Sequence, residues 1–337
     1  MPDRRPEALE EFFKTMGAAT AAKVQSAARE LEQERLGTAL MRAARSNSLD
    51  VVEGLLADDA PADFRLSVNG TGLSTTEVHT PLLWAVRHGN AAMAKKLIMY
   101  GAGLETPVGD LTPPEKGEGG TPETVFSNTF FLPTPAMTEL FLQHGANPNV
   151  AISSTTSSMR TTGWARSTAL LDLLKSPGRL AHALVLLSYG ADPNAPFSCE
   201  YTNQRGYHSR CAMSPLFVAL RYIPDPAALL QAVAALLARG AQPNAVSEYT
   251  EHVPNPDCHS LPEDNPSTGH YISPVLCVQR HETPLHAAVR TGSRDLVLLL
   301  LKSGADPGIP STRLDHPPIA TIDLCPSDDL KALLISF

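Results

Sequence analysis

The feature that most constrains this chain is a pattern that recurs five times along it. Each occurrence begins with a Thr or Ser followed by apolar residues and ends 21 to 26 residues later with the dipeptide Gly-Ala. The opening residues are Thr80, Thr124, Thr168, Ser214 and Thr283, and the closing dipeptides begin at Gly101, Gly145, Gly190, Gly240 and Gly304. An internal repeat at nearly constant spacing indicates stacked copies of one small unit, so it determines the architecture before any other feature does.

Each unit is predicted to contain two helices joined by a turn. A Thr or Ser at the start can accept a hydrogen bond from the first helical turn, and a following Pro loses no hydrogen bond. The turn is expected at Asn47 in the first unit, Gly89 in the second and Gly292 in the last. The second helix is expected to end at the Gly of Gly-Ala, which tolerates the left-handed conformation. One helix pair cannot bury its own apolar face, so the predicted fold class is an all-α solenoid of stacked pairs.

The unit from Thr283 resembles an ankyrin repeat. It reads Thr-Pro-Leu-His-Ala-Ala, then has Gly292, Leu298–Leu300 and the sequence Gly-Ala-Asp-Pro from Gly304. The unit from Thr80 is similar, with Leu where the family usually has His. The units in between keep their ends and differ in the middle, and the earliest one lacks the closing Gly-Ala.

The resemblance covers about residues 36–337 and implies an ankyrin-repeat array of about six helix pairs. The predicted units start near Thr38, Thr80, Thr124, Thr168, Ser214 and Thr283. A C-terminal half-repeat that caps the array is expected from Pro317. Residues 6–35 are predicted to form two amphipathic helices, and the segment 1–35 is expected to act as an N-terminal helical cap on the first repeat. The alternative is a helix that docks onto a partner.

The units are separated by long insertions. Their starts lie 42 to 69 residues apart, whereas an ordinary ankyrin repeat has about 33 residues. The excess lies where the family places its β-hairpin fingers, which are therefore predicted to be long: 104–123, 147–167, 192–213 and 242–282. Because insertions in repeats lie on one face, often the binding face, we expect the fingers to form a binding surface. The alternative is variation that surface loops tolerate at little cost in stability.

The charge of the chain bears on its partners. The net charge is −8 without a basic run, which argues against direct binding to nucleic acid. No apolar stretch is long enough to span a membrane, and the charged residues near the N-terminus argue against a signal peptide. We therefore expect a cytoplasmic or nuclear protein, and a monomer.

Acidic residues concentrate in two fingers, where 104–123 and 245–281 each carry a net charge of −4. Finger 147–167 has two Arg and no acidic residue. The hypothesis is that the acidic fingers attract a partner with a basic segment while a Trp anchors it. The alternative is a charged, solvated face, with the Trp packed under its own finger. The candidate partner-binding residues are Glu105, Asp110, Glu118, Arg160, Trp164, Glu248, Glu251 and Asp257.

Cysteine and histidine residues gather in the last two fingers. A structural zinc ion there would stabilise such long loops, but no Cys-x2-Cys pair occurs and the spacings fit no standard zinc module. Disulfides are not expected in a reducing compartment, so no cofactor is predicted and zinc is the alternative. The candidate ligands are Cys199, His208, Cys211, Cys258, His259, His270, Cys277 and His281.

Two classes of function remain. The chain has neither a Gly-x-Ser-x-Gly nucleophile motif nor a phosphate-binding loop. The prediction is a non-enzymatic scaffold for protein–protein interaction, and the family resemblance implies adaptors, inhibitors or transcriptional co-regulators. The alternative is an atypical enzyme or small-molecule binder with a cleft under the last two fingers, using His208, Cys211, His259 and His270.

Overall fold

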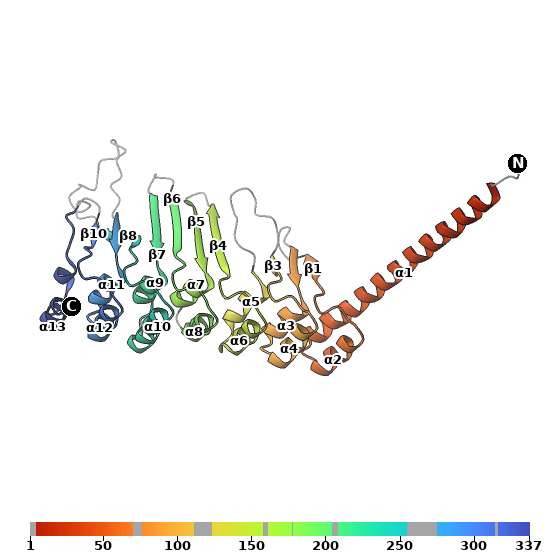
Figure 1. Cartoon of the computed structure of the whole chain (residues 1–337), viewed down its shortest axis with the longest axis horizontal. Helices are drawn as coiled ribbons and strands as arrows, with labels where there is room; N and C mark the ends of the chain where they lie inside the picture. Colours follow the sequence, from red (N-terminus) through yellow and green to blue (C-terminus); the bar gives the residue numbers. More distant parts are fainter. Residues whose placement is uncertain are drawn as a thin grey trace, which may run out of the picture. The chain divides into compact units, whose positions relative to one another are not determined.

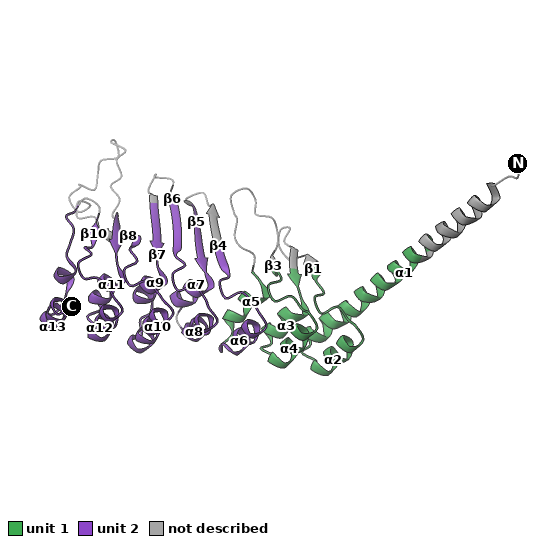
Figure 2. Cartoon of the chain, viewed as in Figure 1, with its two compact units in different colours: residues 1–112, 122–132 green, residues 113–121, 133–337 purple. Residues whose placement is uncertain are grey.

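The structure is a computed structural model of the 337-residue chain. It describes residues 5–69, 76–110, 123–157, 161–176, 178–203, 208–254, 275–313 and 316–337. The chain divides into two compact units, shown in Figure 2. Unit 1 comprises residues 1–112 and 122–132, and unit 2 comprises residues 113–121 and 133–337.

Unit 1 contains helices that pack in pairs beside a small antiparallel sheet of order β1-β2-β3 (Figure 1). Helix α1 packs against α2 and α3, and α3 packs against α4 and α5. The elements are α1 (Arg5–Arg45), α2 (Leu49–Ala57), β1 (Leu66–Asn69), β2 (Thr76–His79), α3 (Pro81–Arg87), α4 (Ala91–Met99), β3 (Gly109–Asp110), α5 (Val125–Asn128) and the 3-10 helix η1 (Thr129–Phe131).

Unit 2 has two rows of helices below a sheet (Figure 1). The inner helices α7, α9 and α11 pack against one another in sequence, and the outer helices α6, α8, α10 and α12 do the same. The helices are α6 (Ala136–Gln143), α7 (Ala169–Lys175), α8 (Leu180–Ser188), α9 (Pro215–Tyr222), α10 (Pro226–Ala238), α11 (Pro284–Thr291), α12 (Arg294–Lys302), η3 (Thr321–Leu324) and α13 (Asp328–Ile335).

The Gly-Ala dipeptides end helices as predicted. The five glycines have φ between 87° and 91°, a conformation that side chains with a Cβ rarely adopt. The amide of the following Ala donates to the carbonyl five residues earlier, at 3.0–3.1 Å in every case. This bond satisfies a carbonyl that the helix leaves unpaired, so the dipeptide both stops the helix and closes it. The dipeptides start at Gly101, Gly145, Gly190, Gly240 and Gly304.

The predicted caps at the helix starts are confirmed at three of five positions. Thr80 Oγ1 accepts from an amide of α3 at 3.1 Å, and Ser214 Oγ accepts from an amide of α9 at 3.3 Å. Thr124 forms a reciprocal capping box with Ser127. In the last repeat, the amide of Thr283 donates to Nδ1 of His286 at 2.9 Å. The hydroxyl Oγ1 of Thr168 is buried without a hydrogen-bond partner. The sequence pattern therefore locates these starts correctly but does not determine which atom caps each one.

Asparagine side chains clamp successive pairs together in unit 2. Asn194 Nδ2 donates to the carbonyl of Gly240 at 2.9 Å, and its Oδ1 accepts from the amide of Gln242 at 2.8 Å. Asn244 makes the same two bonds to the next closing loop, and Asn149 makes them one unit earlier. Each asparagine satisfies two backbone groups of the next unit, and this fixes the spacing of the stack.

The fingers of unit 2 pair into one antiparallel sheet of seven strands, in the order β10-β9-β8-β7-β6-β5-β4. Strands within a finger form the hairpins β4/β5, β6/β7 and β8/β9, and neighbouring fingers pair with each other. The strands are β4 (Ala151–Ser157), β5 (Thr161–Thr168), β6 (Phe197–Asn203), β7 (His208–Met213), β8 (Ser247–Pro254), β9 (Val275–Glu282) and β10 (Thr312–Arg313).

The predicted all-α class was therefore wrong, although hairpins were expected in the fingers. Fingers of this length bring unpaired strand edges side by side, and edges that lie 4.7–4.9 Å apart satisfy each other's backbone groups. Helix stacking provides that alignment, so the sheet is a consequence of the repeat.

The N-terminal region also differs from its prediction. Residues 5–45 form one helix, not two, and Thr38 lies inside it without starting a helix. The sequence between residues 18 and 38 is rich in Ala, Glu, Leu and Arg, which favour helix continuation. Val24 is 64% exposed and Leu31 is 67% exposed, so this part of α1 does not cover the first repeat as a cap would.

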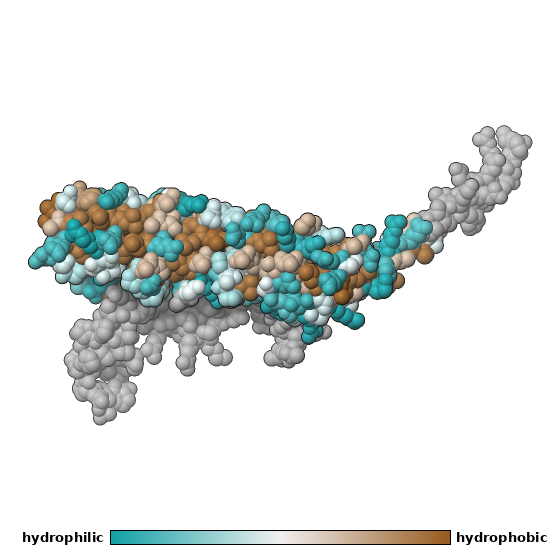
Figure 3. Space-filling model, turned by 90° about the horizontal axis from the view of Figure 1, so that it is seen from below, coloured by the Kyte–Doolittle hydropathy of each residue, from teal (hydrophilic) through white to brown (hydrophobic). Residues whose placement is uncertain are grey.

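The surface of the helices is mixed in character. Viewed from the side of the helices, apolar residues gather over the helical rows with polar residues between them (Figure 3). Exposed large apolar residues of these helices in unit 2 include Tyr222 and Leu230. Among the described residues, no helix is both long enough and apolar enough to cross a membrane.

Candidate interaction surface

The finger sheet of unit 2 has two distinct faces. Residues directly opposite each other on antiparallel strands lie on the same face. One face, here called the inner face, carries Ala165, Cys199 and Cys211 in register, and further along Tyr249 opposite Arg280. The outer face carries Trp164, Glu200 and Arg210 in register, and Glu248 opposite His281. The Tyr249 ring packs on Phe217 of α9, with ring centroids 5.5 Å apart, so the inner face is the one that meets the inner helices.

A cation ends each inner helix under the inner face. Each cation lies seven residues after the Thr or Ser that starts its repeat: Lys175 after Thr168, Arg221 after Ser214 and Arg290 after Thr283. Lys175 Nζ lies 3.0 Å from the centroid of the Phe197 ring, and Arg221 Cζ lies 4.4 Å from that of Tyr249. Burial lowers the pKa of Lys175, an effect that its neighbour Asp172 opposes. These helix ends and the finger residues Phe197, Tyr249 and Glu282 above them are here called the groove, in which Lys175 and Arg221 hold positive charge on aromatic rings.

Arg290 differs because it meets a carboxylate. Both of its terminal nitrogens donate to the side chain of Glu282, which is 1% exposed. Tyr249 Oη donates to Glu282 Oε2 at 2.9 Å, and Ser311 Oγ donates to Oε1 at 3.0 Å. Burial alone would raise the pKa of Glu282. The hydrogen bonds and the positive charge of Arg290, together with hydrogen bonds from Tyr249 and Ser311, instead lower this pKa below its ordinary value. Glu282 is thus a buried anion with every oxygen satisfied.

Burial and the nearby carboxylate raise the pKa of Tyr249 to about 12. The phenol is therefore neutral at physiological pH, and its hydroxyl hydrogen is available for the bond to Glu282. The same hydrogen bond and the packing on Phe217 hold the ring in place. Tyr249 consequently presents a fixed aromatic face to Arg221.

A cavity of about 200 Å³ lies at this point, between α9 and α11 and below β8 and β9. It contains both apolar and charged groups. Its lining is Phe217, Leu220, Arg221, Tyr249, Glu282, Ala287, Arg290 and Thr291.

A second cavity of about 350 Å³ lies among the ends of α7 and α9 and the starts of α8 and α10. Its walls are mostly apolar and include Leu173, Leu180 and Ile223. Its one acidic carboxylate is that of Asp225, which already caps α10 through the amide of Ala228 at 2.8 Å, and the phenol of Tyr222 also lines it. This cavity therefore offers apolar packing space and little chemistry.

Unit 1 has its own stacked cations. Arg45 at the end of α1 and Arg87 at the end of α3 both contact Trp84, with guanidinium carbons 5.4 Å and 5.2 Å from the ring centroid. Arg87 is also the seventh residue after the first residue of its unit, Thr80. The combination of a cation and an aromatic ring at an inner helix end therefore occurs in unit 1 as well as in unit 2.

Trp164 lies on the outer face and is 37% exposed. The guanidinium carbon of Arg166, on the same strand, lies 5.4 Å from the ring centroid. The indole is thus not packed under its own finger, as one alternative held. Its role as a partner anchor stays a prediction.

The acidic finger residues fall mostly outside the described side chains. Glu118, Arg160 and Asp257 lie outside the described residues, as do the side chains of Asp110 on β3 and Glu251 on β8. Glu105 is exposed. Glu248 is half-buried and accepts from Gln279 Nε2 at 2.7 Å, so it acts at least partly within the sheet.

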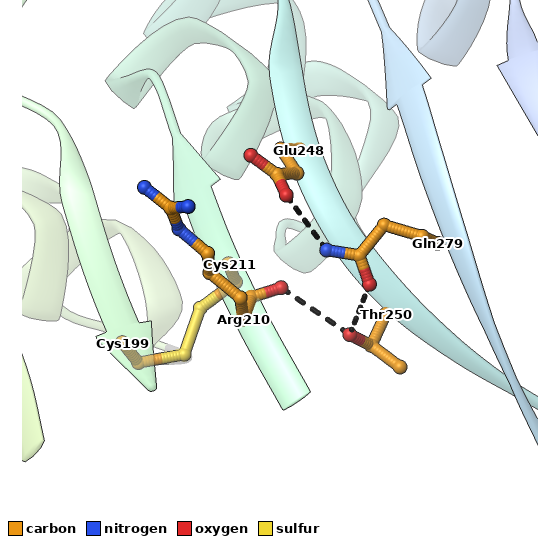
Figure 4. Close-up of a disulfide and its surroundings, with 6 residues drawn as sticks. All are labelled: Cys199, Arg210, Cys211, Glu248, Thr250 and Gln279. Atoms are coloured by element: carbon orange, nitrogen blue, oxygen red, sulfur yellow. Dashed lines mark hydrogen bonds between the residues drawn. A yellow bond between two sulfur atoms is a disulfide. The ribbon is translucent and has the colours of Figure 1, made fainter. Parts of the chain in front are cut away.

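Glu248 belongs to a network that joins two fingers (Figure 4). Among the described residues, strands β7 and β8 have one paired register position, Ala212 with Glu248. Beyond it, Thr250 Oγ1 lies 3.2 Å from the Arg210 carbonyl and 3.0 Å from Gln279 Oε1. These side chains connect β7, β8 and β9 where the backbone ladder is short.

The structure corrects the prediction for the cysteines. Cys199 and Cys211 form a disulfide across the β6/β7 hairpin, with Cα atoms 5.1 Å apart (Figure 4). The bonded sulfur atoms are not thiolates, so this pair does not form a zinc site, and Cys211 offers no thiol for catalysis. The spacing led us to weigh metal ligands, whereas the two residues are in fact direct cross-strand neighbours.

The remaining metal candidates are not brought together by the described residues. His281 is half-buried on β9. Cys258, His259 and His270 lie outside the described residues, and so do the side chains of His208 and Cys277. Within the part of the chain that the structure describes, no three His, Cys, Asp or Glu side chains gather in a way that could hold a metal ion.

The groups that line the groove were not predicted from the sequence. The candidate residues came from the long fingers, so they did not include Arg221 and Arg290 at the inner helix ends. They also did not include the hydrogen-bonded pair Tyr249 and Glu282. The recurrence of a cation seven residues after the start of every unit except the one from Thr124, which has Phe131 there, could have identified the helix ends. The partner of each cation comes from the next finger, and no local pattern in the sequence identifies it.

Comparison with known proteins identifies repeats of one family in two segments of the chain. The family model described as ankyrin repeat matches residues 79–106 and 280–312, which contain α3 with α4 and α11 with α12. A search of curated proteins finds no match.

Solved structures similar to the chain are ankyrin repeat domains. That of human ASB11 is 18% identical with a TM-score of 0.44, over 88% of this chain and 96% of that chain. That of Bcl-3, described as a unique member of the IkappaB protein family, is 19% identical with a TM-score of 0.48, over 88% and 97%. A domain from Acinetobacter baumannii AYE is 20% identical with a TM-score of 0.45, over 79% and 98%.

The family-specific pattern extends beyond the two matched segments. The left-handed Gly with its Ala hydrogen bond closes all five Gly-Ala units, and His286 bonds Thr283 through Nδ1 at 2.9 Å in the Thr-Pro-Leu-His sequence. With two segments matched by the family model and the same helix ends repeated between them, this chain contains ankyrin repeats.

Proposed function

We propose that this chain is a non-enzymatic adaptor or regulator that holds a partner protein on the finger sheet and inner helices of unit 2. Ankyrin repeats in general mediate protein–protein interaction and are generally not enzymes. The observation that carries the proposal for this chain is the pairing of its fingers into one sheet. Paired strands present a wide, ordered wall above the inner helices, whereas separate loops would have to be ordered on binding at an entropic cost.

Two further features support a protein partner. The groove contains a Lys and two Arg beside aromatic rings, and Arg and aromatic residues are enriched in protein interfaces. The cavity of about 200 Å³ is smaller than the roughly 300–1,000 Å³ of typical small-molecule sites. The alternative of an enzyme under the last two fingers loses Cys211 to the disulfide.

The charge of the fingers supports a finer proposal. Fingers 104–123 and 245–281 each carry a net charge of −4, so the partner is proposed to carry a basic segment that is attracted to them. Affinity for such a partner falls as ionic strength rises. Regulation, including a role as a transcriptional co-regulator, would act through that protein, with no direct contact to nucleic acid. The chain itself is proposed to be a monomer in the cytoplasm or nucleus.

Photo-crosslinking from the sheet tests the proposal. A benzoylphenylalanine placed at Trp164 is compared with one at Leu230 on α10, because both positions are 37% exposed and only one lies on the finger sheet. Both proteins are incubated with extract of the native cells. We expect one discrete protein adduct from position 164 that is absent from position 230. Equal labelling of the same proteins from both positions would contradict the proposed surface.

A further inference from the structure

We propose that the cavity between α9 and α11 is a subsite for an acidic side chain of a bound protein segment, and that Arg221 binds its carboxylate. The inference rests on the proposed protein-binding function and deepens it, since it names the chemistry of one partner residue.

The charges of the lining carry the first step. Two guanidinium groups, those of Arg221 and Arg290, face one carboxylate, Glu282. Arg290 binds both oxygens of Glu282, and Tyr249 and Ser311 complete its hydrogen bonds. A second arginine, Arg280, approaches the same carboxylate at 3.8 Å. Both carboxylate oxygens of Glu282 therefore have hydrogen-bond partners, and the lining of the cavity carries a net charge of +1.

Arg221 is the group to which that positive charge belongs. Among the described residues it forms no ion pair or hydrogen bond through its side chain, and its one recorded contact is the stacking on Tyr249. Tyr249 supplies no negative charge, because its pKa is raised to about 12. An exposed guanidinium normally relies on water for its hydrogen bonds. Here a bound carboxylate could replace that water in a charge-assisted pair.

The guanidinium is also held in a geometry suited to that role. Its Cζ lies 4.4 Å from the centroid of the Tyr249 ring, and its N–H groups, which form no hydrogen bond among the described residues, can form a fork to a carboxylate. The ring beneath it is fixed by the bond to Glu282 and by Phe217. Because the group is already ordered, less conformational entropy is lost when it binds.

Size and lining select a side chain as the occupant. A volume of about 200 Å³ suits one long side chain better than a whole small molecule, whose sites span roughly 300–1,000 Å³. Phe217, Leu220 and Ala287 provide apolar contacts for a methylene stem. The chain as a whole has a net charge of −8, which repels a polyanion. The expected occupant is therefore a single Glu or Asp within a segment that is otherwise neutral or basic.

Selection of random peptides tests the inference. Phage-displayed 12-residue peptides are selected on the full chain, on Arg221→Gln and on Arg210→Gln. Arg210 is the matched control, because it is an exposed arginine of the same unit whose side chain lies on the outer face of the sheet. Thermal melting of all three proteins verifies that they are folded. We expect one acidic position to be enriched on the full chain and on Arg210→Gln, and to be lost on Arg221→Gln.

The enriched peptide then gives a quantitative cycle. Replacing its acidic residue by the matching amide, or Arg221 by Gln, should each weaken binding roughly 10- to 100-fold, the range for a hydrogen bond to a charged group. The two changes together should cost little more than either alone, since each removes the same pair. Fully additive losses would overturn the inference.

The outcomes separate the inference from the function it rests on. Enriched peptides without an acidic position, or with one that persists on Arg221→Gln, would overturn the inference and leave protein binding intact. If no peptide is enriched, the affinity of the protein crosslinked at position 164 is measured with Arg221→Gln, and an unchanged affinity would overturn it. If neither peptide nor crosslinked protein is found, the proposed function fails as well.

Discussion

Arg221 and Arg290 occupy the same position in successive units, yet their surroundings differ. Arg290 meets the buried Glu282 at the base of the β9 strand and forms a closed ion pair. Arg221 contacts the ring of Tyr249 and forms no ion pair with a carboxylate among the described residues. The helices that carry them are alike, so the difference comes from the finger residue opposite each cation. The same repeat position thus stabilises the fold in the last unit and is open to a ligand in the preceding one.

The largest expected effect comes from removing each arginine in turn. Arg290→Gln leaves the buried Glu282 without its main partner and should lower the free energy of unfolding by about 3–5 kcal/mol. Arg221→Gln breaks no ion pair and should change it by about 0.5 kcal/mol or less. Urea unfolding followed by circular dichroism measures both. Similar losses for the two variants would show that the surroundings of the two cations are not distinct.

The hydroxyl of Tyr249 connects the closed pair to the open site. Tyr249→Phe removes the donor to Glu282 and should cost about 1.5–3 kcal/mol, the range for a hydrogen bond to a charged group. The ring stays under Arg221, so binding of an acidic peptide should be unchanged. Unfolding and peptide titration on the same sample measure both effects. Weakened peptide binding with unchanged stability would reverse the roles assigned to the two parts of this side chain.

The closed pair should also govern the response to acid. The lowered pKa of Glu282 means that its stabilisation is complete above its ordinary value of 4.5 and is lost as pH falls below it. Burial lowers the pKa of His286 below its ordinary value of 6.5, so stability begins to decline once pH falls below that value.

We therefore expect the midpoint of urea unfolding to decrease from pH 7 to pH 5 and to fall further below pH 4.5, the ordinary value for Glu282. In Glu282→Gln the decline below pH 4.5 should be smaller, since its carboxylate no longer takes up a proton. Identical pH profiles for the two proteins would contradict the assignment to Glu282.

The smallest expected effect on stability is at the outer face of the sheet. Trp164→Ala removes a half-exposed side chain and should cost about 1 kcal/mol or less, whereas partner affinity should fall if the indole is an anchor. Thermal melting and partner titration measure the two quantities. Unchanged affinity would remove Trp164 from the proposed surface and leave the groove as the remaining site.

The sequence predicted those parts of the fold that depend on neighbouring residues. Gly190 and Ser214 mark a helix end and a helix start because their preferences act within one turn. The failure at Thr38 shows the limit of such signals: Gly37 precedes it but no proline follows, and the helix from Arg5 continues through both residues.

The sheet and the groove depend on residues far apart in the sequence. The pairing of Ala212 with Glu248 joins two fingers, and the stacking of Arg221 on Tyr249 joins a helix to the next finger. Neither has a local signal, because the alignment arises only when whole units stack. The disulfide belongs to this class, since spacing alone gave no reason to pair Cys199 with Cys211 before the strand register was known.

The contrast between the two arginines can be measured most directly from their side-chain Nε–Hε resonances in the ¹⁵N-labelled protein. The full chain is titrated with N-acetylglutamate N-methylamide, and with the glutamine analogue as the neutral control. We expect a saturable shift at Arg221 that the glutamine analogue does not produce, and no such shift at Arg290 or Arg210. Equal shifts at all three arginines, or a shift at Arg290 without one at Arg221, would contradict this expectation.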